Sequence, residues 1–183
     1  MQIVSVTIQG KTPILLHNPA GMAGRKPGKT EIPTPEAASF ESCYWTPEKD
    51  SLGFPGDNVK ASMLVASTQY KAGKIKLGPF IAGSVFIEPA MLSFNTKEYE
   101  IDTRRAVIQR QGILRSRARI SKWKLTFDLI VDDDFPATNI DVLKEILSES
   151  GRRVGIGDYR PQRKGWFGKF EVIDWKVKSN GRR

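Results

Sequence analysis

Cysteine and histidine are scarce in this chain, and each scarcity excludes a class of site. The single cysteine, Cys43, cannot form an intramolecular disulfide. One cysteine and one histidine cannot make a zinc site of the usual kinds, so we expect no metal and no cofactor. No apolar run approaches the roughly 20 residues of a membrane-spanning helix, and the N-terminal MQIVSVTIQG alternates like a strand instead of resembling a signal peptide. These absences predict a soluble, cytoplasmic protein without a membrane partner.

Acidic residues are also too few to balance the basic ones. Lysine and arginine total 29 against 20 aspartates and glutamates, which gives a formal charge of +9 and a pI near 9.7. A surplus of this size favours anionic partners, nucleic acid among them. A length of 183 residues fits one domain, residues 1–183, with enough apolar residues for a single core.

Hydrophobic periodicity predicts the order of the main elements. Alternation of period two predicts strands at 2–10, 84–94, 122–131 and 170–177, with Pro89 indicating an edge or a bulge in the second. Three- and four-residue spacing predicts helices at 34–45, 57–73 and 140–151. Residues 18–35, rich in glycine and proline, are expected to form a long mobile loop. The order matches an α+β, ferredoxin-like split βαβ with an open antiparallel sheet.

The basic residues are concentrated in one segment. Between Thr103 and Lys124 there are eight cations and no acid. Arg115, Arg117 and Arg119 have the same parity as Trp123 and the apolar residues after it, and charged arginines cannot line that core. Either a bulge near Ser121 reverses the faces, or the strand continues past the body of the domain. We favour a protruding basic β-hairpin over residues 103–122 with its tip near Gln111 and Gly112; the alternative is an ordinary solvated surface.

A second unusual segment is GIGDYRPQRKGWFGKFEV, residues 155–172, which contains four glycines and four cations. Glycine allows a close approach of the backbone to a ligand, and arginine binds phosphate well. The aromatic residues Tyr159 and Trp166 flank the arginines and could stack on bases. A dinucleotide-binding fingerprint is excluded, because that motif follows a strand and opens a helix. The alternative interpretation is a helix cap followed by an ordinary hairpin loop.

The stretch FPGDNVKASML (54–64) and the C-terminal pattern G-x-G…G-x-x-G-x-F together resemble the RAMP superfamily, the RRM-like proteins of CRISPR systems. The resemblance implies an RRM-like fold. Within the superfamily, the chain most resembles the backbone subunit that coats CRISPR RNA in antiviral ribonucleoprotein complexes. It would be a compact or phage-borne relative of that subunit. It also implies a homo-oligomeric filament, contact with other effector subunits, and a thumb-like hairpin at the basic segment. Lys60 and the glycine-rich loop would then face the nucleic-acid backbone.

We therefore predict a non-catalytic subunit that binds single-stranded RNA, or single-stranded DNA, with little sequence preference. Its expected nucleic-acid-binding residues are Lys60, Arg104, Arg105, Arg110, Arg115, Arg117, Arg119, Lys122, Arg152, Arg153, Gly155, Gly157, Tyr159, Arg160, Arg163, Lys164 and Trp166.

Two other functions remain open at this point. The RAMP superfamily also contains metal-independent endoribonucleases, and His17, the only histidine, could act as the acid or base with Tyr44, Tyr159 or a lysine. Acidic residues offer no better site, because the consecutive residues 132–134 on a turn point in different directions and favour a solvated loop over a metal cluster. Alternatively, the basic surfaces bind an acidic protein partner.

Overall fold

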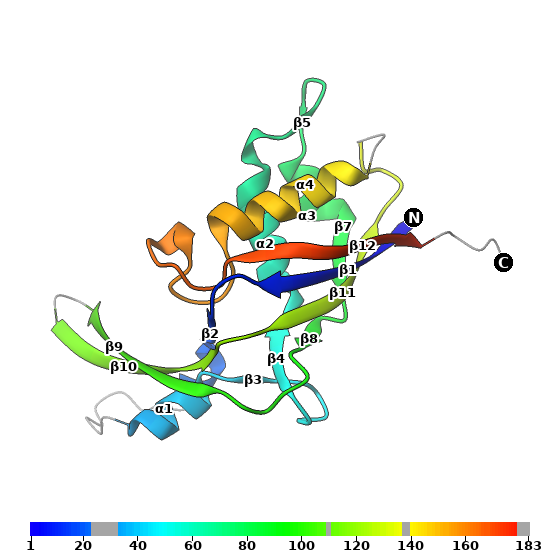
Figure 1. Ribbon diagram of the computed structural model, residues 1–183. Coiled ribbons are helices and arrows are strands. Elements are labelled where there is room, and N and C mark those ends of the chain that lie inside the picture. The colour runs from blue at the N-terminus through cyan, green and yellow to red at the C-terminus, as the bar shows by residue number, and fades with distance from the viewer. Residues whose placement is uncertain (23–32, 109–110, 137–139, 179–183) are drawn as a thin grey trace.

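The computed structural model describes residues 1–22, 33–108, 111–136 and 140–178, and within them the chain is an α+β protein (Figure 1). The strands are β1 Gln2–Gly10, β2 Ile14–Leu15, β3 Tyr44–Trp45, β4 Leu52–Pro55, β5 Lys71–Ala72, β6 Ile75–Lys76, β7 Val85–Glu88, β8 Met91–Ser93, β9 Glu100–Ile108, β10 Gln111–Ile120, β11 Lys124–Val131 and β12 Phe170–Lys178. The helices are α1 Pro35–Glu41, α2 Gly56–Ala66, α3 Gly78–Ser84 and α4 Asp141–Glu149, with short turns η1 Pro19–Met22, η2 Ser67–Gln69, η3 Ser150–Val154 and η4 Pro161–Arg163. None of the helices in the described ranges is long and apolar enough to cross a membrane.

The main sheet is formed by the strands β12-β1-β11-β7, in that order, and every neighbouring pair is antiparallel. The alternation of the first strand predicts its place correctly, because Val4, Val6 and Ile8 are fully buried on one face. In β11 the same rule buries Leu125 and Phe127. Helix α2 lies in sequence between β1 and β7, and helix α4 lies between β11 and β12.

Helices α2 and α4 cover one face of the main sheet. Met63 of α2 and Leu143 and Ile146 of α4 join the core formed by β1 and β11, and all three are fully buried. Trp123, which the sequence assigns to the core, is also buried there, and its indole N–H donates to the carbonyl of Thr12 at 2.9 Å. These helices thus cover one face of the sheet, and no helix of the described residues covers the opposite face.

The uncovered face of the main sheet pairs two of its lysines with its own carboxylates. Lys178 Nζ lies 2.6 Å from Asp128 Oδ2, and Lys176 Nζ lies 2.8 Å from Asp174 Oδ2. Because these lysines already have carboxylate partners on the sheet, this face is a weaker candidate for a polyanion than the surface described below.

Several predicted boundaries need correction. The strand expected over residues 84–94 is divided into β7 and β8, which belong to different sheets, because Pro89 between them has no N–H to continue a ladder. The helix expected over 57–73 ends at Ala66, and Gly73 instead forms the turn of the small β5–β6 hairpin with a φ of 62°. Most of the loop expected at 18–35 lies outside the described residues.

The hairpin expected over 103–122 is present as β9 and β10, which pair antiparallel and project from the body (Figure 1). Strand β10 also pairs with β2, in a sheet separate from the main one. The chain turns at Ser121 and Lys122 before entering β11. The arginines can therefore share the parity of the core residues without lining the core, because β10 and β11 belong to different sheets, and no bulge is needed.

Candidate nucleic-acid interface

The β9–β10 hairpin is fixed to the glycine loop, which we define as residues 155–169. Arg117 of β10 lies with its Nε 2.6 Å from Oδ2 of Asp158 in the loop. The guanidinium of Arg104 lies over the ring of Phe167, 4.7 Å from its centroid. The backbone N–H of Asp158 also donates to the carbonyl of Leu15 in β2 at 2.9 Å. Hairpin and loop therefore form one continuous surface, which we call the hairpin–loop surface.

Two of the loop glycines predicted to approach a ligand are required by the loop itself. Gly155 and Gly157 have φ values of 73° and 76°, a region that favours glycine. A Cβ on Gly157 would lie 2.7 Å from the carbonyl oxygen of Leu15. Gly155 is buried, and its carbonyl accepts a hydrogen bond from Ser62 Oγ of α2 at 3.0 Å. Their positions are explained by internal packing, and contact with nucleic acid stays a prediction.

The predicted stacking residues Tyr159 and Trp166 are both exposed on the loop. Their exposed fractions are 40% and 51%. Phe167 between the loop and the hairpin is fully buried, and its ring centroid is 4.9 Å from that of Trp166. The N–H of Phe167 donates to the carbonyl of Tyr159 at 3.2 Å. Phe167, an aromatic residue near the cations that could also have stacked on bases, is instead buried, where it packs against Trp166 and its N–H fixes the backbone at Tyr159.

Two exposed cations, Arg163 and Lys164, share the loop with these rings. Arg105 is exposed on β9, but it follows Arg104, which faces the loop, so its side chain lies on the opposite face of the hairpin, beside Gly112 of β10. Arg160 is half-buried, and its Nη1 donates to the carbonyl of Gly157 at 3.0 Å. Burial, reinforced by the neighbouring Arg163, lowers the pKa of Arg160, which nevertheless stays positively charged at neutral pH.

The expectation that the hairpin arginines lack acidic partners is wrong. The ladder places Arg117 opposite Asp102 and Arg119 opposite Glu100, and these two acids lie just before the basic segment in the sequence. Arg119 Nη1 is 3.5 Å from Glu100 Oε2. Asp102 instead binds Arg104, with Nε 2.5 Å from Oδ1.

Arg117 is the most deeply placed of these arginines, with 7% of its surface exposed. Its Nε and the Oδ2 of Asp158 form an ion pair without hydrogen-bond geometry, so both atoms are buried without a hydrogen-bond partner. Burial lowers the pKa of Arg117, and the charge of Asp158 opposes that shift. An arginine held in this way positions the loop on the hairpin and is a poor candidate for direct contact with phosphate.

The remaining predicted residues are not all brought to this surface. Arg115 is half-buried opposite Arg104 in the ladder, and Lys122 is exposed in the turn after β10. Lys60 donates to the carbonyl of Ala82 at 2.8 Å and contacts α3, not the hairpin. Arg152 and Arg153 lie at the end of α4, beside a separate pocket. Arg110 lies outside the described residues.

His17 lines a cavity of about 230 Å³ between η1, α2 and the glycine loop. The side chains of Tyr44, Asn58 and Arg160 share this cavity. Tyr44 Oη donates to the backbone carbonyl of His17 at 2.8 Å, so its hydroxyl is engaged in a structural contact. Burial lowers the pKa of His17 below its usual 6.5, and the nearby charge of Arg115 adds to that effect. His17 is consequently neutral at physiological pH.

This lowered pKa predicts a pH dependence of stability. Because the unfolded chain takes up a proton at His17 near pH 6.5 and the folded chain does so only at lower pH, the free energy of unfolding falls on acidification below that value. Above pH 6.5 the contribution is constant. We expect His17→Gln to remove this contribution to the dependence of the free energy of unfolding on pH. Urea unfolding between about pH 7.5 and about pH 5.5 measures that dependence. Equal slopes in both proteins would contradict the assignment.

The geometry defines the protein as an α+β protein with a basic, aromatic surface on a projecting hairpin and its supporting loop. Comparison with known protein families finds no family model that matches, and comparison with curated proteins finds no match either. Within the residues that the structure describes, no group of three or more histidine, cysteine, aspartate or glutamate side chains could hold a metal ion.

Proposed function

We propose that this protein is a non-catalytic subunit that binds single-stranded RNA, or single-stranded DNA, through the hairpin–loop surface. The observation that carries the proposal is the presence of two exposed aromatic rings, Tyr159 and Trp166, and two exposed cations, Arg163 and Lys164, on one short loop. The contacts of Arg104 and Asp158 hold this loop on the hairpin.

This combination suits a single strand better than a duplex. Bases of a single strand are free to stack on aromatic side chains, and the backbone follows the positive charge. Stacking is tolerant of sequence because every base has an aromatic face, so binding has little sequence preference. Among the described residues, neither the main sheet nor α1 presents a comparable cluster of exposed rings and unpaired cations, which makes the hairpin–loop surface the place to test.

The arrangement of the main sheet supports the finer fold assignment. The strand order β12-β1-β11-β7, with α2 and α4 as the connecting helices, is the order expected for a ferredoxin-like split βαβ. The RAMP resemblance of residues 54–64 and of the glycine loop adds the more specific role of a CRISPR RNA-coating backbone subunit. In that role copies of the chain polymerise along the strand, and native mass spectrometry with oligonucleotides of increasing length should show added copies at regular length intervals.

Removal of the exposed rings is the direct test of the stacking role. We expect Tyr159→Ala combined with Trp166→Ala to weaken binding of a labelled single-stranded oligonucleotide by about 1–3 kcal/mol for each base that loses its stacking partner. The dependence of affinity on salt should stay unchanged, because no charge is removed. The measurement is fluorescence anisotropy at several salt concentrations.

Phe86→Ala is the matched control for this pair. Phe86 is another exposed aromatic, 44% accessible, but it lies on the edge strand β7. Its removal should leave oligonucleotide affinity within twofold of the wild type. Equal affinity of the Tyr159/Trp166 variant and the wild type would reject the stacking role.

A second candidate function, metal-independent endoribonuclease activity, rests on the His17 cavity. The neutral imidazole of His17 is the form that a general base needs, and Arg160 supplies a positive charge in the same cavity. Incubation with single-stranded RNA separates the two functions. The binding subunit leaves the RNA intact, whereas cleavage that is lost in His17→Ala with binding retained would establish the ribonuclease.

A further inference from the structure

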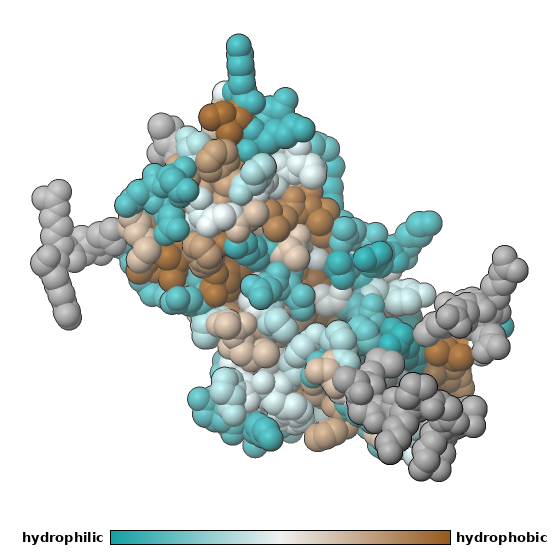
Figure 2. Space-filling model, turned by 180° about the vertical axis from the view of Figure 1, so that it is seen from behind, coloured by the Kyte–Doolittle hydropathy of each residue, from teal (hydrophilic) through white to brown (hydrophobic). Residues whose placement is uncertain are grey.

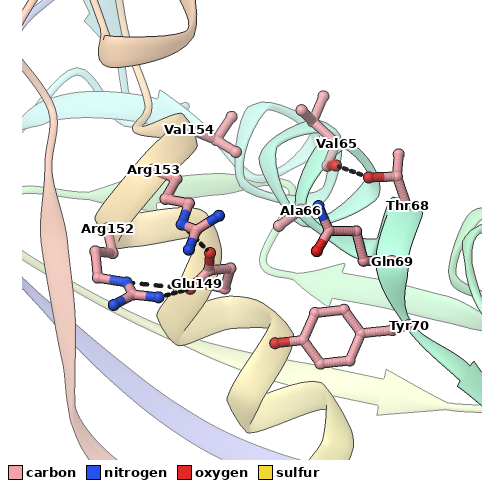
Figure 3. A pocket seen from close by; sticks show the side chains of 9 residues that line it. All are labelled: Val65, Ala66, Thr68, Gln69, Tyr70, Glu149, Arg152, Arg153 and Val154. Carbon is pink, nitrogen blue, oxygen red and sulfur yellow. Dashed lines mark hydrogen bonds and ion pairs between the residues drawn. The ribbon is translucent and has the colours of Figure 1, made fainter.

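A second pocket, of about 420 Å³, opens between the end of α2 and the end of α4 (Figure 3). None of its lining residues belongs to the hairpin or to the glycine loop. It is lined by Val65, Ala66, Thr68, Gln69, Tyr70, Glu149, Arg152, Arg153 and Val154. The pocket is therefore distinct from the hairpin–loop surface, although the sequence assigned its two arginines to the same function.

The polar wall of this pocket carries two guanidinium groups on one carboxylate. Arg152 donates from Nε and Nη2 to Glu149 Oε2 at 3.1 and 2.6 Å, and Arg153 Nε lies 2.5 Å from Oε1 (Figure 3). Both guanidinium groups thus share one carboxylate, and the carboxylate of Glu145 also lies near Tyr70. Each guanidinium has five N–H donors, and Arg153 contacts Glu149 through Nε, which leaves its terminal N–H groups without a partner among the described residues.

The local backbone explains why both arginines reach the same acid. They follow Glu149 by three and four residues, a spacing that places helical side chains on one face. The helix then ends in a π-helical turn, η3, closed by the N–H of Gly155 donating to the carbonyl of Ser150 at 2.8 Å. Turns of this kind occur frequently at functional sites.

The opposite wall combines apolar side chains of α2 with the ring of Tyr70. Figure 3 shows Tyr70 and Gln69 across the pocket from the arginines, with Val65 and Ala66 of α2 above them. The ring of Tyr70 is half-buried and packs against the core, so its position is fixed. A ligand with a planar body could therefore lie on Tyr70 while its charged group meets the guanidinium groups.

Additional positive charge lies next to Tyr70. The β5–β6 hairpin follows directly, and its residues Lys71, Lys74 and Lys76 are exposed. Hydrophilic side chains form the projecting tip of this hairpin (Figure 2). No ion pair found among the described residues includes these three lysines. The surroundings of the pocket thus add to its attraction for an anion.

From these observations we infer that the pocket binds a nucleoside monophosphate group, with the phosphate on Arg152 and Arg153 and the base on Tyr70. Guanidinium groups match phosphate geometry with paired hydrogen bonds. A volume of about 420 Å³ is far larger than a bare phosphate needs and falls in the range of about 300–1,000 Å³ typical of small-molecule sites. The group could belong to a free nucleotide or to the phosphorylated end of a strand. Either case goes beyond the proposed function, which concerns internal phosphates on another surface.

Calorimetric titration of the full chain with AMP, adenosine and inorganic phosphate tests the inference. AMP should bind, adenosine should bind at least tenfold more weakly, and phosphate should bind more weakly than AMP because it lacks the base. Equal binding of AMP and adenosine would overturn the role of the arginines, and equal binding of AMP and phosphate would overturn the role of Tyr70. Failure of AMP to bind at millimolar concentration would overturn the site altogether.

Variants locate the site. Arg152→Gln combined with Arg153→Gln should weaken AMP binding at least tenfold, and Tyr70→Leu should weaken AMP several-fold without changing the affinity for phosphate. Lys144→Gln, which removes one positive charge from the exposed face of α4 outside the pocket, should leave AMP binding unchanged. AMP affinity that is equal in the double arginine variant and in Lys144→Gln would place AMP elsewhere.

Oligonucleotides distinguish the two sources of the ligand. If the pocket accepts the end of a strand, a 5′-phosphorylated oligonucleotide should bind more tightly than its 5′-hydroxyl counterpart, and the double arginine variant should lose that difference. If only free nucleotides enter, the two oligonucleotides should bind equally while AMP still depends on the arginines. Loss of oligonucleotide binding in hairpin–loop variants with AMP binding retained would show that the two sites are independent.

Discussion

Reversal of the exposed charges Arg163 and Lys164 to glutamate should reduce affinity for a single-stranded oligonucleotide by about 10-fold or more at low salt. Both side chains are exposed on the hairpin–loop surface, and none of the ion pairs found in the described part of the chain includes them. Loss of two phosphate contacts should also reduce the slope of log affinity against log salt by roughly 1.4, since each contact on a single strand contributes about 0.7. Anisotropy titrations over a range of salt concentrations measure both quantities.

The control for this variant must carry the same change in net charge. Reversing Lys97 and Lys144, which are exposed and lie outside the hairpin–loop surface, lowers the formal charge from +9 to +5, as the first variant does, because two cations become two anions in each. The control should keep most of the wild-type affinity. If both variants lose affinity to the same extent, binding follows total charge and the hairpin–loop surface has no special role.

The largest effect on stability is expected at Asp158. Asp158→Asn leaves the guanidinium of Arg117, which is 8% exposed at its side chain, without its carboxylate partner. Breaking one side of a buried ion pair costs about 3–5 kcal/mol, and we expect a loss near the lower end because Asp158 is 24% exposed. Urea unfolding followed by circular dichroism measures the loss.

Two further variants separate the ion pair from other causes. Arg117→Met combined with Asp158→Asn leaves no unpaired charge and should recover much of the lost stability, so the two single changes should not be additive. Arg152→Gln, which removes an exposed ion pair with Glu149, should cost less than about 1 kcal/mol. Additive losses in the double variant would show that Arg117 and Asp158 do not stabilise the fold as a pair.

The main sheet could be predicted because its strands have one buried face. Val4, Val6 and Ile8 alternate with polar residues, and a one-residue error in register would expose all of them. The short strands β3 and β4 and the helix α3 could not be predicted in this way. Strand β3 has two residues and β4 has four, and both faces of β4 are buried, so no alternation marks them.

The sequence predicted part of the candidate site. The errors concern contacts between residues that are distant from one another in the sequence. Tyr159, Trp166, Arg163 and Lys164 are exposed together because they share one short loop. The partners of the hairpin arginines were missed because antiparallel pairing brings residues before one strand opposite residues in the next. A count limited to residues 103–124 cannot include Glu100, which the ladder places opposite Arg119.

For the arginines that follow α4, by contrast, the sequence itself contains the pattern that predicts their contacts. Arg152 and Arg153 follow Glu149 at helical spacing, and that pattern predicts contacts with the acid on one face of the helix. Their closeness in sequence to Gly155 suggested the nucleic-acid surface instead. Both arginines lie within the π-helical turn η3, and the chain leaves this turn at Gly155 with a φ of 73°, so neighbours in sequence line different sites.

The ion pair between Arg117 and Asp158 affects the thermodynamics of ligand binding. Since the loop is tied to the hairpin in the free protein, the rings and the cations already hold their relative orientation before a ligand arrives. Little conformational entropy is then lost on association, and preorganisation of this kind raises affinity without adding a single contact. Weakening the Arg117–Asp158 ion pair should consequently slow association and increase the magnitudes of both the binding enthalpy and the binding entropy. This should hold even where every group that contacts the ligand is unchanged.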